Sequence, residues 1–485
     1  MIKIVLFITS GILPVLAFSI LPTIGYAVFE NNFSFASKLT ILSIFSLLTS
    51  ILIRKFVNPT RQLNTIQGYG AVGLSWLFMS FFATIPYLLS GINLSFINIY
   101  FETVSGLTTT GSSILVNIEN TDKALLIWRS TTQWLGGMGI IVLTITVLPL
   151  LGSGGINLFK AESPGPSADR LTPKFKDTAK LLWFVYISIT LIQTLFLYLS
   201  GLNFYDSFNH SLTTLSTGGF STLNSSVSNF STLSIFIINI FMLIAGSSFI
   251  LIIKVVKSKN IRNLLNSTEF KFYLFIVFST SIIFLIKTYS ISGNFLEGMN
   301  NALFTALTLI TTTGFTNLDY EIWSVNYRTF ILGLMFLGGM AGSTAGGLKT
   351  VRVIALLKSV RNEIRKILYP NAIFKIRMSK SILPEKMIES VQTFFILYVA
   401  IFVTGTFMLG ITSSMFGSSI SFEATLSAVA SAINNIGPGL SELGPSKNYF
   451  WLDNGSKMIL SLLMIIGRLE IFPIAILFYK KTWKT

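Results

Sequence analysis

The sequence has no cysteine, one histidine and few charged residues. Without cysteine, neither disulfides nor thiolate-bound metals are available to this chain of 485 residues. The one histidine, His210, has no second histidine or cysteine to act with, so we interpret it as a packing residue rather than a catalytic one. Charged residues make up 11% and hydrophobic residues 52% of the chain, which excludes an ordinary soluble domain and indicates a polytopic membrane protein.

Long apolar runs account for most of the chain, and each is long enough to cross a hydrocarbon core of ~30 Å. The ten runs cover residues 4–29, 36–53, 71–89, 125–151, 181–202, 233–256, 272–290, 329–357, 391–411 and 458–478. The first run is longer than the apolar part of a secretory signal and is followed at once by a second. We therefore predict that it is a membrane helix.

Charged residues alternate in sign from loop to loop. The formal charge of +16 does not indicate a nucleic-acid partner, because the Lys and Arg residues cluster after every second run. By the positive-inside rule these loops and both termini are cytoplasmic. The clusters contain Arg54, Lys55, Arg61, Lys160, Arg170, Lys174, Lys176, Lys180, Lys254, Lys257, Lys259, Arg262, Lys271, Lys349, Arg361, Arg365, Lys366, Lys375, Arg377, Lys380, Lys386, Lys480, Lys481 and Lys484. The other loops predict an acidic outer mouth that concentrates cations, with Glu102, Glu119, Asp122, Asp206, Asp319, Glu321, Glu442 and Asp453.

Four short polar segments that end in glycine recur along the chain, at residues 108–111, 216–219, 311–314 and 434–437. Polar backbone of this kind occurs at membrane depth only where protein or water, rather than lipid, surrounds it. Each segment lies between an odd-numbered run and the next even-numbered run, so all four enter from the outer side. The pattern predicts an all-α membrane protein with four parallel helix, pore-loop, helix repeats around one pore, and does not indicate inverted repeats. The predicted units are an N-terminal helix pair at 1–62 and repeats at 63–165, 166–262, 263–375 and 376–485.

The glycine segments have the composition of an ion filter, in which backbone carbonyls replace the hydration shell of a cation. An apolar stretch before each segment predicts a short pore helix, and glycine permits the positive φ that lets carbonyls point inward. A single segment would suit an ordinary loop or a small-residue helix contact equally well. Four at equivalent places favour a K⁺ filter, made of Thr109, Thr110, Gly111, Thr217, Gly218, Gly219, Thr312, Thr313, Gly314, Asn435, Ile436 and Gly437.

The eighth apolar run is interrupted by glycine. Five glycines in ten residues make a continuous helix improbable, because each costs ~1 kcal/mol relative to alanine in a helix. We predict a break in mid-membrane that lines the pore below the filter and acts as a gate. The alternative is a tightly packed helix crossing. The predicted gate residues in this run are Gly338, Gly339, Gly342, Ser343, Gly346 and Gly347.

Two charged residues, Arg468 and Glu470, lie inside the tenth apolar run. An intramembrane charge is expensive and is a functional candidate by default. Positions i and i+2 of a helix point to different faces, so the two residues are not expected to neutralise each other. Arg468 is predicted to face the pore or to bind gate-loop carbonyls, which would leave Glu470 in need of another partner. The alternative for both is a structural ion pair between helices.

At these residues the chain resembles the TrkH potassium-uptake subunits of the Trk/Ktr/HKT superfamily, over essentially its whole length. The matching motifs are TTTGS (108–112), QWLGGMG (133–139), AESPGP (161–166), STGGFST (216–222), TTTGFT (311–316), GSTAGGLKT (342–350), NNIGPG (434–439) and GRLEIF (467–472). The resemblance implies that Gly111, Gly219, Gly314 and Gly437 are the filter glycines and that the glycine-rich stretch is the gate. Glycine rather than serine at the first of these positions favours K⁺. The fourth filter segment departs most from the threonine pattern.

The resemblance also implies partners and a location. Members of this family are homodimers of the bacterial cytoplasmic membrane and associate with a cytosolic ring of nucleotide-binding, TrkA-like subunits. K⁺ is the transported ion, and no organic cofactor is expected on this chain. The basic loops suit such a partner and would equally suit anionic lipid.

Two other functions remain to be compared. An ion-coupled K⁺ symporter would need a site that responds to H⁺ or Na⁺, for which Glu470 is the obvious carboxylate. An intramembrane hydrolase is not supported, because Ser343 lacks the G-x-S-x-G spacing and His210 lies in another repeat. We therefore predict a gated K⁺ pathway and no enzyme activity.

Overall fold

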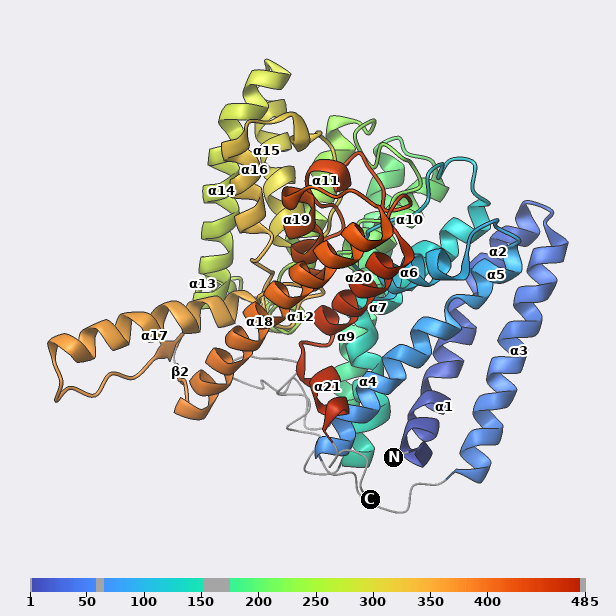
Figure 1. The fold of residues 1–485 in the computed structure, drawn as a ribbon, viewed down its shortest axis with the longest axis horizontal. Helices are drawn as coiled ribbons and strands as arrows, with labels where there is room; N and C mark the ends of the chain where they lie inside the picture. The colour runs from blue at the N-terminus through green and yellow to red at the C-terminus, as the bar shows by residue number, and fades with distance from the viewer. Residues whose placement is uncertain (1, 58–64, 152–174, 380, 480–485) are drawn as a thin grey trace.

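The protein is a bundle of helices with an N-terminal helix pair at one edge (Figure 1). The structure, a computed structural model, describes residues 2–57, 65–151, 175–379 and 381–479. The motif at 161–166 therefore lies outside the described residues, as do Arg61, Lys160, Arg170, Lys174, Lys380, Lys480, Lys481 and Lys484. The only sheet among the described residues is a short antiparallel hairpin of β1 (Arg377–Met378) and β2 (Ser381–Ile382).

In the N-terminal pair, the first predicted run forms α1 (Ile2–Ser19) and α2 (Leu21–Phe29), and the second run forms α3 (Phe33–Phe56). The first run is divided because Pro22, in the first turn of α2, has no N–H to continue the hydrogen bonding of α1. α3 begins at Asn32, whose side chain accepts a hydrogen bond from the Phe35 amide. The pair packs on the first and last helices of repeat 1, outside the ring of repeats.

Each repeat contains a first helix, a short pore helix and a second helix, as predicted. Repeat 1 comprises α4 (Thr65–Phe82), α5 (Ile85–Ser90), α6 (Phe96–Leu107) and α7 (Lys123–Leu151). Repeat 2 comprises α9 (Phe175–Leu199), α10 (Phe204–Leu215), α11 (Thr232–Ala245) and α12 (Phe249–Ser258), and is followed by α13 (Arg262–Leu265). Repeat 3 comprises α14 (Thr268–Ser292), α15 (Phe295–Ile310), η2 (Tyr320–Ile322), α16 (Val325–Leu334) and α17 (Thr350–Leu368). Repeat 4 comprises α18 (Glu385–Phe416), α19 (Phe422–Asn434), η3 (Ser441–Leu443), α20 (Asn454–Arg468), α21 (Phe472–Ala475) and η4 (Ile476–Phe478).

Repeats 1 and 2, and repeats 2 and 3, meet through a second helix and the next pore helix, whereas repeats 3 and 4 meet through α17 and α18. α7 of repeat 1 contacts α10 of repeat 2, and α11 of repeat 2 contacts α15 of repeat 3. α20 of repeat 4 returns to contact α6 of repeat 1, so the first and last repeats are neighbours. This order surrounds one central axis, which is the arrangement that four parallel repeats predict.

Three of the ten predicted runs are sharply bent or broken. Within the described residues, six helices are long and apolar enough to cross a membrane, and two bent helix pairs would raise the number to eight. The run at 233–256 bends by 95° between α11 and α12, and the run at 458–478 bends by 114° between α20 and α21. The run at 329–357 has no α-helix between Leu334 and Thr350, so the predicted break is confirmed.

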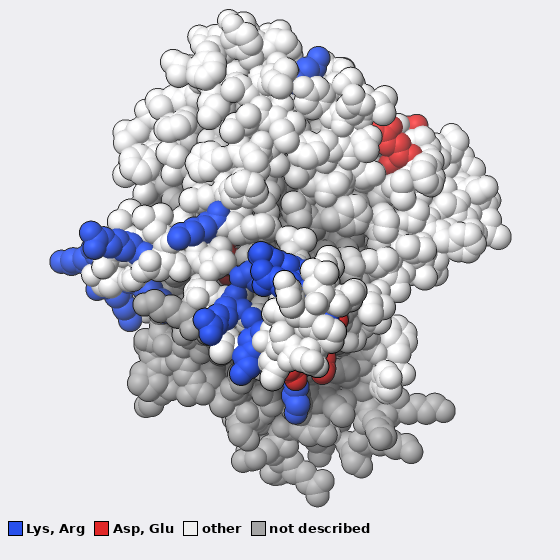
Figure 2. Space-filling view, turned by 90° about the vertical axis from the view of Figure 1, so that its left-hand side faces the viewer, with Lys and Arg blue, Asp and Glu red and all other residues white. Residues whose placement is uncertain are grey.

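α17 leaves the bundle sideways, toward the left in Figure 1, and does not continue the direction of α16. Its outer half is exposed and carries Lys358, Arg361, Arg365 and Lys366. Figure 2 views the molecule from that side and shows Lys and Arg gathered across the middle of the face, with few above them. The inner part of the eighth run is therefore an amphipathic surface helix rather than half of a membrane span.

Candidate functional site

The four pore helices begin in the same way. Each follows a Ser or Asn whose side chain accepts a hydrogen bond from a backbone amide in the first turn, which is the signature of an N-cap. The caps are Ser95, Asn203, Asn294 and Ser421, bonded to the amides of Asn98, Asp206, Leu296 and Ala424. The C-terminal ends of these helices, where the helix dipole is negative, lead directly into the four predicted filter segments.

The four filter segments share one backbone conformation. The residue two positions before each filter glycine is left-handed, with φ of 56° at Thr109, 53° at Thr217, 55° at Thr312 and 55° at Asn435. The glycines also have positive φ, of 87° at Gly111, 75° at Gly219, 78° at Gly314 and 106° at Gly437. Threonine in the left-handed region is strained by about 1–3 kcal/mol, and such strain is concentrated at ligand-binding positions. Four equal deviations at the predicted places indicate four equivalent strands.

The filter glycines and the carbonyls before them form a closed ring. A Cβ on Gly111 would lie less than 3.0 Å from the carbonyl oxygen of Gly218, which precedes the glycine of the next repeat. The same relation joins Gly219 to Thr313, Gly314 to Ile436, and Gly437 back to Thr110. We call these eight residues the filter ring. Each strand thus lies against the next without room for a side chain, and the fourth strand closes on the first.

The outer side of the filter ring is hollowed. A cavity of about 230 Å³ is lined by all four filter glycines and by residues of the following loops. Among its described lining residues, none is acidic, and Arg129 and Lys447 are basic. The prediction of an acidic mouth is therefore wrong for the part of the mouth next to the filter. Glu102 in particular is fully buried on α6 and does not face the cavity.

Glu102 supports the filter from behind. Its carboxylate accepts hydrogen bonds from Arg129 Nε at 2.7 Å, the Ile114 amide at 2.8 Å and Ser113 Oγ at 3.0 Å. Arg129 also donates to the Ser221 carbonyl at 2.8 Å, so the pair joins the strands of repeats 1 and 2. A buried ion pair of this kind needs every hydrogen bond to offset its desolvation. The pattern of charges along the chain did not reveal this ion pair, because its two residues are 27 positions apart in the sequence.

His210 occupies the same place in repeat 2. Glu102 lies nine residues before Gly111, and His210 lies nine residues before Gly219. His210 is buried on α10, with Nδ1 at 2.8 Å from the Asp206 carbonyl and Nε2 at 3.0 Å from Ser221 Oγ. These contacts are those of a packing residue. On α7, Gln133 donates to the Gly218 carbonyl and accepts a hydrogen bond from the Phe220 amide, which supports the same strand.

The fourth filter segment preserves the geometry with different side chains. Asn434 donates to the Ala430 carbonyl at 2.8 Å, as the Thr108 hydroxyl donates to the carbonyl four residues before it. Asn435 tolerates left-handed φ better than threonine does, and it donates to Thr110 Oγ1 at 2.9 Å across the boundary between repeats 4 and 1. The departure in sequence at 434–436 is thus not a departure in backbone conformation.

The predicted gate residues lie in the segment between α16 and α17, residues 335–349, which we call the gate loop. It lies directly below the filter ring: the Gly346 amide donates to Thr312 Oγ1 at 2.7 Å, and a Cβ on Gly346 would meet the Asn434 carbonyl. The Thr344 hydroxyl donates to the Leu215 carbonyl at 2.9 Å, at the end of the second pore helix. Loop residues therefore contact the filter segments or pore helices of repeats 2, 3 and 4.

The bend in repeat 2 makes room for the gate loop. The Gly246 carbonyl, at the end of α11, accepts a hydrogen bond from the Met340 amide at 2.9 Å. The Phe249 amide, at the start of α12, donates to the Gly342 carbonyl at 3.0 Å. The backbone groups that the bend frees are thus satisfied by the loop, as mid-membrane backbone requires. Of the predicted gate residues, Gly338, Gly339, Gly342, Ser343, Gly346 and Gly347 all belong to this loop.

Arg468 joins the gate loop to repeat 1. It is the last residue of α20, and its guanidinium donates to the Thr344 carbonyl at 2.9 Å and to the Gly136 carbonyl of α7. Of the two possibilities that the sequence left open, Arg468 thus binds a gate-loop carbonyl. Glu470 lies in the bend after α20 with φ of 55° and forms an ion pair with Arg352 of α17. Arg468 and Glu470 have separate partners, as predicted.

Two further charged residues hold the loop and were not predicted. Glu269, in the first turn of α14, accepts hydrogen bonds from the Ala341 amide at 2.7 Å and from Thr350 Oγ1 at 2.8 Å. Lys349 is buried and donates to the Ala345 carbonyl. Charged side chains therefore hold the middle of the gate loop and its junction with α17. The sequence did contain a signal for Glu269, because it is an acidic residue directly before the apolar run 272–290.

Comparison with known proteins identifies the family of the chain. The family model TrkH, described as cation transport protein, matches residues 32–484. The Trk system potassium uptake protein TrkH of Escherichia coli K12 is 34% identical over 428 residues, which cover 87% of each chain. Trk system potassium uptake protein TrkI of Halomonas elongata is 33% identical over 85% of this chain and 82% of its own. The crystal structure of the potassium transporter TrkH from Vibrio parahaemolyticus superposes over 100% of both chains with a TM-score of 0.86 and 29% identity. The chain therefore belongs to the TrkH family of cation transport proteins.

Proposed function

We propose that the chain takes up K⁺ through the filter ring, across the cytoplasmic membrane of a bacterium, with both termini in the cytoplasm. The closed ring is the observation that carries the proposal, because four strands with inward glycines can replace the hydration shell of one cation. The names of the relatives, which are potassium uptake proteins, support K⁺ as the ion. Membership of a transporter family supports the prediction that the chain has no enzyme activity. Ser343 Oγ donates to the Met340 carbonyl rather than contacting a histidine.

The gate loop is proposed to close the pathway below the filter. Its contacts with Thr312, Leu215, Arg468 and Glu269 support a position across the axis, on the inner side of the filter ring. Opening would require these hydrogen bonds to break while the filter ring keeps its geometry. A glycine-rich segment permits such a change of φ and ψ at low cost.

A cytosolic nucleotide-binding subunit is proposed to act through α17. Thr350, the first residue of this helix, is bonded to Glu269, which also holds Ala341 of the gate loop. Arg352 is paired with Glu470 in the bend that follows Arg468, so movement of α17 would be transmitted to the loop and to this bend. Its outer half exposes Leu357, Ile364 and Ile367 beside the basic residues, which suits a protein partner with acidic groups. We also propose that two copies of the chain associate, as the family resemblance implies.

The test of K⁺ uptake is Rb⁺ flux into proteoliposomes of the purified protein. Flux that K⁺ blocks and Na⁺ blocks less supports the proposal, and absence of flux with any alkali cation contradicts it. An imposed pH or Na⁺ gradient then distinguishes passive permeation from a symporter. We expect flux to follow the K⁺ gradient alone, because Glu470 is occupied by Arg352.

Replacing Arg468 by alanine is expected to raise basal flux roughly tenfold. Of the two bonds that the change removes, the one to the Thr344 carbonyl holds the gate loop. A hydrogen bond to a charged group is worth about 1.5–3 kcal/mol and 1.4 kcal/mol corresponds to a factor of ten, so tenfold is the lower end of the expected rise. Rb⁺ flux without the cytosolic subunit measures the effect. Arg468→Lys is the matched control, because lysine keeps the charge but lacks the planar guanidinium that donates to two carbonyls at once. We expect it to restore part of the restraint. Lower flux in Arg468→Ala with normal assembly would show a structural role instead.

Glu269→Gln is expected to raise basal flux by a smaller factor, about threefold. Glutamine keeps an acceptor oxygen but loses the charge that strengthens the bonds to Ala341 and Thr350, by roughly half of their energy. Glu297→Gln is the control, since Glu297 is exposed in the first turn of α15. The same Rb⁺ assay compares them. Equal flux in both variants and the wild type would remove Glu269 from the gate.

A further inference from the structure

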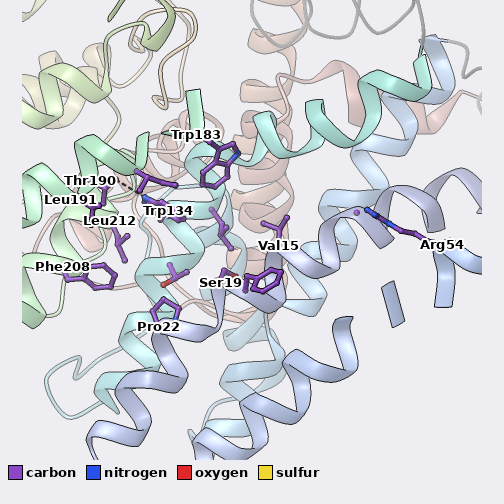
Figure 3. Close-up of a pocket in the computed structure, with 15 residues that line it drawn as sticks. Val15, Ser19, Pro22, Arg54, Trp134, Trp183, Thr190, Leu191, Phe208 and Leu212 are labelled. Carbon is purple, nitrogen blue, oxygen red and sulfur yellow. Dashed lines mark hydrogen bonds between the residues drawn. The ribbon is translucent and has the colours of Figure 1, made fainter. Parts of the chain in front are cut away.

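An apolar cavity of about 640 Å³ lies between the N-terminal helix pair and repeats 1 and 2, apart from the filter and the gate loop. Its volume is in the range of small-molecule sites, about 300–1,000 Å³. Figure 3 shows Val15, Ser19 and Pro22 on one side. The opposite wall comes from α7, α9 and α10, and includes Trp134, Trp183, Thr190, Leu191, Phe208 and Leu212.

Three polar groups of the opposite wall, Trp134 Nε1 and the hydroxyls of Thr190 and Thr131, already have hydrogen-bond partners within it. Trp134 Nε1 donates to Thr190 Oγ1 at 3.2 Å, and the Thr190 hydroxyl donates to the Tyr186 carbonyl at 2.8 Å. The Thr131 hydroxyl donates to the Ile127 carbonyl at 2.7 Å. A polar ligand would lose its hydration here without gaining hydrogen bonds. The part of a ligand that fills the cavity is therefore hydrocarbon.

The rim of the cavity is continuous with the lipid-facing surface. Phe18, Ile187 and Leu191 line the cavity and are exposed. Large exposed apolar side chains on a membrane protein face the hydrocarbon of the bilayer. The chains that can reach this cavity directly are those of the surrounding lipids. α1 and the start of α2 contribute lining residues from Gly11 to Pro22, a length of roughly 16 Å at 1.5 Å per residue, which accommodates much of an acyl chain.

The charge at the cavity is confined to Arg54, at the end away from Phe208 in Figure 3. Arg54 is in the last turn of α3, and its Nε donates to Ser10 Oγ at 3.4 Å. Among the described residues, no carboxylate lies within ion-pair distance of it. This turn follows the second apolar run and is predicted to be cytoplasmic, where basic side chains attract anionic headgroups.

We propose that the cavity binds one anionic phospholipid of the inner leaflet, with an acyl chain between α1 and α9 and its phosphate at Arg54. The apolar wall selects the acyl chain, and the guanidinium of Arg54 selects the charge of the headgroup. The inference is independent of the proposed transport function. The bound chain would pack against α7, the helix that also carries Gln133 and the carbonyl bound by Arg468.

The test is lipid retention by the full-length protein in detergent, measured by native mass spectrometry. The probes are phosphatidylglycerol, phosphatidylcholine with the same acyl chains, and oleic acid. We expect phosphatidylglycerol to be retained about fivefold more strongly than phosphatidylcholine, the factor expected for one basic residue at the membrane surface. Arg54→Gln should remove this preference. Lys55→Gln is the matched control and should keep it, because Lys55 is the next residue but does not line the cavity.

A second pair of variants tests the cavity itself. Leu191→Trp fills it, whereas Leu195→Trp adds the same volume one turn further along α9, at an exposed position outside the lining. Only Leu191→Trp should reduce retention of phosphatidylglycerol. Both variants should remain monodisperse in size-exclusion chromatography. Equal retention in these two, or equal loss in Arg54→Gln and Lys55→Gln, would show nonspecific annular binding and overturn the proposal. Stronger retention of oleic acid than of phosphatidylglycerol would overturn it as well.

Discussion

Gly314→Ser is expected to abolish most of the preference for K⁺ over Na⁺. Gly314 has φ of 78°, and a Cβ there would collide with the Ile436 carbonyl of the next strand. The left-handed conformation alone costs about 1–2 kcal/mol for a residue with a side chain. The collision is with backbone, so the strand of repeat 4 must move and one quarter of the filter ring loses its geometry. Competition of Na⁺ and K⁺ for Rb⁺ uptake measures the change, which we expect to be roughly tenfold or more.

Gly333→Ser is the matched control for Gly314→Ser. Gly333 lies in α16 of the same repeat, has no positive φ, and has open space where a Cβ would be. This variant should keep wild-type competition. Gly111→Ser, at the equivalent place in repeat 1, should behave like Gly314→Ser because its Cβ would meet the Gly218 carbonyl. Unchanged competition in both filter variants would mean that the filter assignment is wrong.

The fold could be predicted because its repeating features are local. Each pore helix follows a capping Ser or Asn and ends three or four residues before a filter glycine, so spacing alone identifies α6, α10, α15 and α19. The break before Thr350 was also predictable, since five glycines in ten residues do not form a stable helix. The closed ring followed from parallel topology, because four equivalent units with the same orientation can surround one axis.

The bends and the long-range contacts could not be predicted from the sequence. Hydropathy reports how apolar a run is but not its direction, so the turns of 95° and 114° in runs 233–256 and 458–478 left no signal. Glu102 was assigned to the outer mouth because its loop is outside, whereas its burial depends on Arg129 of another helix. The role of Glu269 required knowing that the inner end of α14 meets the gate loop. These properties belong to tertiary packing rather than to any segment.

Deleting residues 341–345 of the gate loop is expected to give the largest rise in K⁺ flux and to make that flux independent of the cytosolic subunit. The deletion removes the Ala341 amide bound by Glu269, the Thr344 hydroxyl bound to Leu215, and the carbonyl bound by Arg468. Three contacts that hold the loop across the axis are lost together, each worth about 1 kcal/mol or more. The open state should therefore become the major one, by roughly two orders of magnitude in its equilibrium constant.

K⁺ selectivity should survive the deletion, because the filter ring is held from behind by residues that the deletion does not touch. The Glu102 and Arg129 pair and the Gln133 contacts lie on the outer side of the gate loop and connect repeats 1 and 2 independently of it. Thr344→Val is the matched control: it keeps the length of the loop and removes only the hydroxyl bonds, so regulation should persist with a small rise in basal flux. The decisive measurement is Rb⁺ flux of both variants with and without the cytosolic subunit and its nucleotide, alongside Na⁺ competition. Wild-type regulation in a folded deletion variant would rule out the gate loop, and loss of selectivity would show that the loop supports the filter instead of closing the pathway beneath it.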